Sequence, residues 1–94
     1  MAAPEYLYTP SKKVSARIID GQLVILRPGS DELLRFNAVA SFIWAQIEVT
    51  PADAKTLTAV IVDAFDVSLE TARSDLLEFL ETMQTQDLIQ RIEP

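Results

Sequence analysis

The pattern of hydrophobic and polar residues changes once, about a third of the way along the 94-residue chain. Before that point, short runs rich in β-branched residues are separated by turn-forming residues, which is typical of strands. After it, apolar residues recur every three or four positions, which is the spacing of amphipathic helices. The sequence therefore predicts an α+β fold, with a three-stranded antiparallel meander followed by a three-helix bundle.

The first two predicted strands form a hairpin. Residues 14–19 and 22–27 flank Asp20 and Gly21, and Asp-Gly is the favoured pair for a type I′ turn because both positions need a positive φ. A second turn then precedes the apolar run 32–36. This run is expected to pair with the second strand, which leaves the third strand at one edge of the meander.

The two faces of the third strand differ in chemistry. Because side chains alternate along a strand, Leu34 and Phe36 share one face, and Leu33 and Arg35 share the other. We predict that Leu34 and Phe36 belong to the core.

Polar residues mark the start of each predicted helix. Asn37 is placed to cap a helix over 38–48. Thr50 begins a capping-box pattern for a second helix that ends near Phe65, and Ser68 is placed to cap a third.

Helical spacing also separates buried from exposed positions. Trp44 lies among apolar residues of the first helix, so we interpret it as a core residue. In the third helix, the predicted inward stripe is Ala72, Leu76, Phe79, Leu80 and Met83, and a flanking row of Leu69, Arg73 and Leu77 is left available to a partner. Residues 1–13 are expected to form an N-terminal arm, and residues 14–94 a single domain whose last apolar residues pack back on the bundle.

Composition excludes much catalytic chemistry. The chain has no cysteine and no histidine, so it lacks a thiolate nucleophile and the commonest proton shuttle and zinc ligand. With Gly21 and Gly29 as its two glycines, it has no glycine-rich phosphate loop, and we expect no cofactor. Glu78 with Glu81, and Asp63 with Asp66, are interpreted as solvated carboxylates, so we assign no catalytic residue and no metal site.

Charge and hydropathy limit the partners. The net charge is −6, and residues 48–94 contain ten acidic but three basic side chains, which disfavours nucleic acid. No apolar segment is long enough for a membrane helix, and the N-terminus lacks the pattern of a secretory signal. We therefore expect a cytoplasmic protein with no membrane partner.

The unpaired edge of the third strand is the most informative candidate surface. An extended peptide could add a strand there, with main-chain hydrogen bonds giving affinity and neighbouring pockets giving selectivity. The alternative is an edge covered by the protein's own tail or by a homodimer.

A set of strand, helix-start and helix-core positions recurs in a characteristic order over 14–89. They are Leu26, Phe36, Asn37, Ala40, Ile43, Trp44, Leu57, Ile61, Phe65, Asp66, Val67, Asp75, Leu76, Phe79, Leu80, Met83, Leu88 and Ile89. This order resembles the PqqD-like proteins, which are the recognition elements of ribosomally synthesised and post-translationally modified peptide (RiPP) pathways. Two positions depart from the family pattern: the longer segment 48–51 replaces an Asp-Gly, and Asp87 replaces a Gly.

The resemblance implies a winged-helix-like, non-catalytic adaptor of a lasso-peptide or pyrroloquinoline-quinone pathway. It would bind the leader of a precursor peptide as a fourth strand, between the third strand and the third helix, and present it to a modifying enzyme or leader peptidase. The short chain and its arm with Tyr6 and Pro10 favour the lasso type. Carried onto this chain, the peptide-binding residues are Glu32, Leu33, Leu34, Arg35, Phe36, Arg73, Leu76, Leu77 and Leu80.

Other interpretations of these residues stay open at this point. Arg35 and Arg73 could hold an acidic leader residue, or Arg73 could pair with Glu70 or Glu78 in its own helix. The helices alone would also fit a winged-helix DNA-binding regulator, and a small enzyme that uses carboxylates is a third hypothesis.

Overall fold

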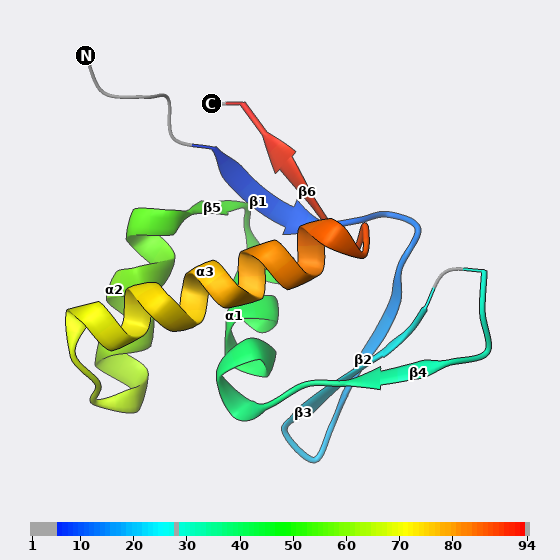
Figure 1. Ribbon diagram of the computed structural model, residues 1–94, viewed down its shortest axis with the longest axis horizontal. Coiled ribbons are helices and arrows are strands. Elements are labelled where there is room, and N and C mark those ends of the chain that lie inside the picture. The colour runs from blue at the N-terminus through cyan, green and yellow to red at the C-terminus, as the bar shows by residue number, and fades with distance from the viewer. Residues whose placement is uncertain (1–5, 28, 94) are drawn as a thin grey trace.

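The polypeptide forms three helices and two small antiparallel sheets (Figure 1), and the predicted α+β class is confirmed. The computed structural model describes residues 6–27 and 29–93. Its elements are β1 (Leu7–Pro10), β2 (Ser15–Ile19), β3 (Gln22–Leu26), β4 (Leu33–Arg35), α1 (Ala38–Val49), β5 (Ala52–Asp53), α2 (Ala54–Phe65), α3 (Leu69–Thr85) and β6 (Ile89–Ile92).

The meander β2-β3-β4 is the predicted one, with β3 in the middle. Asp20 and Gly21 join β2 to β3 with φ angles of 52° and 80°, as a type I′ turn requires. Leu23 and Ile25 of β3 are fully buried, and they lie on the face that packs against α1. The central strand of this sheet is therefore the one that enters the core.

Helix α1 follows β4 almost directly and supplies much of the core. Asn37 is its N-cap, and the Asn37 Oδ1 accepts a hydrogen bond from the Ala40 backbone N–H at 2.9 Å. Trp44 is 1% exposed, and its indole Nε1 donates to Glu48 Oε2 at 3.3 Å. The predicted cap and the predicted core tryptophan are both confirmed.

The second sheet, β5-β1-β6, is missing from the sequence prediction. We expected residues 1–13 to be an arm preceding the domain, yet Leu7–Pro10 pairs on one side with β5 and on the other with β6. The chain tail packs back as predicted, since Leu88 and Ile89 are buried. Strand β1 thus ties the two ends of the described chain together (Figure 1).

The start of α2 is a correction to the predicted capping box. Thr50 is the C-cap of α1, whereas Asp53 is the N-cap of α2 and accepts a hydrogen bond from the Thr56 N–H at 2.7 Å. The physical reason is that residues 52–53 pair with β1, so the helix begins only after that bridge. Helical spacing from Leu57 and Ile61 predicts that Ala64 faces inward on α2, but Ala64 is exposed.

Helix α3 matches its predicted pattern. Ser68 caps it, and all five residues of the predicted inward stripe are buried. At its end, Asp87 has a φ of 60°, in the left-handed region, and the Leu88 N–H donates to the Met83 carbonyl at 2.8 Å. This backbone conformation explains the resembling family's glycine at that position, since glycine adopts it without a steric penalty.

A buried serine joins the meander to α1. The Ser41 Oγ accepts a hydrogen bond from the Leu23 backbone N–H at 2.7 Å and donates to the Asn37 carbonyl at 2.8 Å. Leu23 lies opposite Phe36 at the end of the β3–β4 ladder, where the Phe36 N–H donates to the Leu23 carbonyl at 3.1 Å. The Leu23 N–H bonds to Ser41 instead of to the Phe36 carbonyl. Ser41 therefore completes the hydrogen bonding of β3 at the point where the chain leaves β4.

We predict that Ser41→Ala lowers the free energy of unfolding by about 1–3 kcal/mol, because it leaves the buried Leu23 N–H without its acceptor. Urea denaturation would measure the change. Thr58→Ala is the matched control: its hydroxyl is also buried but bonds only to the Ala54 carbonyl of its own helix. An effect of Ser41→Ala no larger than that of the control would contradict the role given to Ser41.

Candidate functional site

The outer edge of β4 exposes unpaired backbone groups. Two hydrogen bonds show which residues of β4 bond to β3. The Arg27 N–H donates to the Glu32 carbonyl at 2.9 Å, and the Phe36 N–H donates to the Leu23 carbonyl at 3.1 Å. Because inward and outward positions alternate in an antiparallel ladder, the N–H and C=O groups of Leu33 and Arg35 point away from β3.

This edge has no strand beside it in the part of the chain that the structure describes. The sheet ends at β4, and the C-terminal strand β6 pairs with β1 in the other sheet. The protein's own tail therefore does not cover the edge, which was one of the alternatives left open by the sequence.

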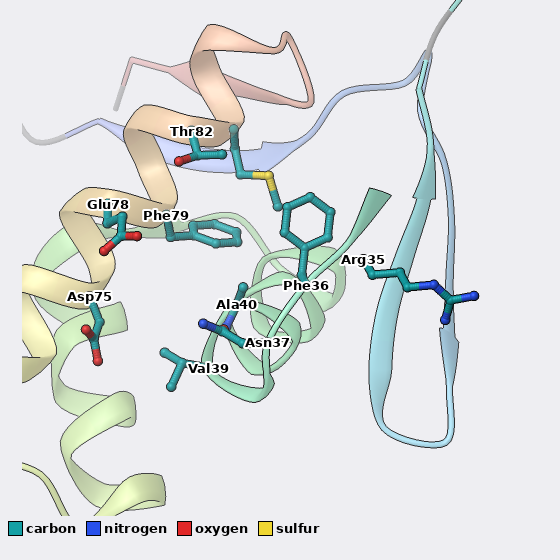
Figure 2. Close-up of a pocket in the computed structure, with 10 residues that line it drawn as sticks. Arg35, Phe36, Asn37, Val39, Ala40, Asp75, Glu78, Phe79 and Thr82 are labelled. Carbon is teal, nitrogen blue, oxygen red and sulfur yellow. The ribbon is translucent and has the colours of Figure 1, made fainter. Parts of the chain in front are cut away.

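A pocket of about 270 Å³ lies between the β4–α1 junction and α3. Figure 2 shows the rings of Phe36 and Phe79 between the strand and the helix, where they form an apolar floor. The lining residues are Arg35, Phe36, Asn37, Val39, Ala40, Asp75, Glu78, Phe79, Thr82 and Met83. Arg35 and Phe36 at the end of β4 line the pocket, so a strand added to this edge would lie beside it.

Charged groups lie on opposite sides of this site. Asp75 and Glu78 line the α3 wall, with Asp75 half-buried and Glu78 exposed. The side chain of Arg35 extends away from the pocket, toward the side of β2 and β3 (Figure 2). The site is thus acidic along α3 and basic on the outer face of the sheet.

The structure divides the predicted peptide-binding residues between two places. Those of the strand lie at the open edge, with Leu33 56% exposed and Leu34 half-buried toward the core. Those of the helix line a second pocket, of about 600 Å³, between α2 and α3. These residues are Arg73, Leu76, Leu77 and Leu80.

The helical period explains this division. The inward stripe of α3 has two flanks, and we predicted that the row containing Arg73 and Leu77 faces β4. That row faces α2 instead, and the flank with Asp75, Glu78 and Thr82 faces the strand. Sequence reasoning missed these three residues because the stripe is defined by periodicity, which does not say which flank meets which neighbour.

The ion pairs within α3 that were the alternative interpretation of Arg73 are not formed. Among the described residues, the ion pair present joins Arg27 Nη1 and Glu32 Oε1 at 3.1 Å, at the exposed turn between β3 and β4. Arg73 therefore has neither Glu70 nor Glu78 as a partner and lies free on the rim of the second pocket.

The described residues also bear on metal sites and membrane spans. They contain no group of three or more Asp or Glu side chains arranged to hold a metal ion. Within residues 6–27 and 29–93, no helix combines the length and the apolar character needed to cross a membrane.

Comparison with known proteins supports the fold and identifies the family. The chain described as "TbiB1 in Complex with the TbiA(beta) Leader Peptide" matches with a TM-score of 0.77 and 24% sequence identity, covering 87% of this chain and 94% of that one. At this identity, the match shows a common fold. Comparison with curated proteins gives no match.

The family model of the coenzyme PQQ synthesis protein D (PqqD) matches residues 22–89, which is more than two thirds of the chain. This range begins at β3 and ends at the first residue of β6, so it includes every element that builds the open edge and its pocket. The chain belongs to the PqqD family.

Proposed function

We propose that this protein binds the leader region of a ribosomally made precursor peptide as a strand added to β4. The observation that carries the proposal is the open β4 edge beside a pocket with an apolar floor. Main-chain groups of Leu33 and Arg35 would bond to the leader, and a leader side chain would enter the pocket beside Phe36 and Phe79.

The pocket is needed for selectivity. Each backbone hydrogen bond contributes about 0.5–1.5 kcal/mol net, and any extended peptide could form it. Burying the apolar part of a leader side chain against Phe36 and Phe79 would add about 0.8 kcal/mol for each methylene group, and that term depends on the sequence of the peptide. Discrimination between leaders would therefore come mainly from the pocket.

The structural likeness to TbiB1 supports this proposal. That protein was solved in complex with a leader peptide, and its fold matches over 87% of the present chain. Membership of the PqqD family extends the likeness to the elements that form the edge and the pocket.

The proposed role is that of a non-catalytic adaptor, which presents the bound leader to a modifying enzyme or leader peptidase. The absence of cysteine and histidine from the sequence supports it. The charge of α3 disfavours the alternative of a DNA-binding regulator, because this would-be recognition helix carries Glu70, Asp75, Glu78 and Glu81 against Arg73. The pathway would be of the lasso-peptide or pyrroloquinoline-quinone type.

Titration with the leader of the precursor encoded beside this gene tests the function. We expect a dissociation constant below roughly 100 μM by isothermal calorimetry. No binding at that concentration would contradict the proposal. Sedimentation with and without the leader would also test the alternative of a homodimer, since two copies paired through β4 would separate when the leader binds.

Proline substitution on β4 should separate binding from folding. Leu33→Pro removes an outward N–H, so we predict at least a tenfold loss of leader affinity with the fold retained. Leu34→Pro is the control, because it removes an N–H that bonds to β3 and should destabilise the domain. Circular dichroism and calorimetry would check both; tight binding by Leu33→Pro would rule out pairing at this edge.

Substitutions on the two flanks of α3 should change leader affinity by different amounts. Thr82→Trp would fill the pocket beside β4, and we predict that it abolishes leader binding. Leu77→Asp lies on the flank that faces α2 and should leave leader affinity within about twofold. The reverse result in fluorescence-anisotropy titrations would place the leader in the α2–α3 pocket instead.

A further inference from the structure

We infer that the register of the leader strand added to β4 is set by charges of opposite sign on the two sides of the β4 edge. A leader residue pointing inward, beside Asp75 and Glu78, would be basic, and its neighbour pointing outward, beside Arg35, would be acidic. This inference rests on the proposed function, and it names the leader chemistry that the site would select.

The alternation of a strand makes such sorting necessary. Successive side chains of the leader would point to opposite faces of the enlarged sheet. A leader residue opposite Phe36 would point inward, over the pocket, since Phe36 itself does so. The adjacent leader residue, opposite Arg35, would point to the outer face, where directly opposed side chains lie about 4.5–5.5 Å apart at Cβ.

The inner face offers carboxylates without cations. Asp75 and Glu78 line the pocket wall, and neither has a basic partner among the described residues. Beside them lies the apolar floor of Phe36 and Phe79 (Figure 2). A lysine or arginine side chain fits this arrangement, because its methylene stem covers the apolar floor while its charged end reaches the carboxylates.

The outer face offers cations without carboxylates. Arg35 of β4 and Arg17 of β2 lie on either side of Val24, in register with it. Val24 is only 9% exposed although it lies on the outer face, which indicates that neighbouring side chains cover it. Neither arginine has an acidic partner in the described part of the chain, so an acidic leader residue opposite Arg35 would gain an ion pair there.

The next outward position would be apolar. Leu33 is 56% exposed and lies in register with Leu26, which is also exposed. The leader residue opposite Leu33 is two positions from the one opposite Arg35, on the same face. From the leader residue opposite Leu33 to the one opposite Phe36, the selected order is therefore apolar, any residue, acidic, basic. This order is read from the N-terminus of a leader parallel to β4 and from the C-terminus of an antiparallel one.

A slip by one residue would turn every leader side chain to the other face. A slip in one direction would put the basic leader residue beside Arg35, and a slip in the other direction would put the acidic one beside Asp75 and Glu78. Such like-charge neighbours disfavour the slipped register, whereas backbone hydrogen bonds alone would tolerate it.

Exchanging the charges tests the inference. The probes are the leader of the precursor encoded beside the gene, and the same peptide with its adjacent acidic and basic residues exchanged. For the unmodified protein, we expect calorimetry to show about a tenfold weaker dissociation constant for the exchanged peptide. The double variant Arg35→Glu/Glu78→Lys keeps the net charge and should prefer the exchanged peptide instead.

A second double variant serves as the matched control. Arg73→Glu/Glu81→Lys makes the same change of charges on exposed residues that do not line the β4 pocket, so it should keep the original preference. Equal affinities of the unmodified protein for the two peptides would overturn the inference, as would a double variant with an unchanged preference. These results are distinguishable from failure of the proposed function, in which the unmodified protein would bind neither peptide.

Discussion

The hydrogen bond between Ser41 and Leu23 is the constraint on which the site depends. The last bond of the β3–β4 ladder is made by the Phe36 N–H, and Asn37 caps α1 at the next residue. By accepting the Leu23 N–H, the Ser41 hydroxyl replaces the ladder with a side-chain bond from the first turns of α1. The strand edge, the start of α1 and the pocket beside α3 are therefore positioned together.

Local patterns predicted most elements of this fold correctly. The correctly predicted features depend on residues that are close in sequence, so one sequence is enough to recognise them. They are the Asp20–Gly21 turn, the Asn37 and Ser68 caps and the inward stripe of α3. Strand β5 has two residues and depends on a partner more than 40 positions away, so no local pattern marks it. Because of the same pairing, the N-cap of α2 is Asp53 and not Thr50.

The candidate site was predictable in part, for a related reason. Alternation along β4 identified the outward-facing Leu33 and Arg35, because a strand has only two faces. A helix stripe has two flanks of similar composition, and tertiary packing decides which one meets the strand. The acidic flank with Asp75 and Glu78 meets β4, whereas the flank with Arg73 and Leu77 meets α2. Helix α3 consequently presents two chemically different surfaces, one for the proposed leader and one still available to another protein.

Amide hydrogen exchange followed by NMR would test the central claim most directly. In the free protein, the N–H groups of Leu33 and Arg35 should exchange rapidly, while those of Leu34 and Phe36, which bond to β3, should be protected. Addition of the leader should slow exchange at Leu33 and Arg35 selectively. Protection of both amides in the free monomer, or no added protection in the complex, would contradict the account.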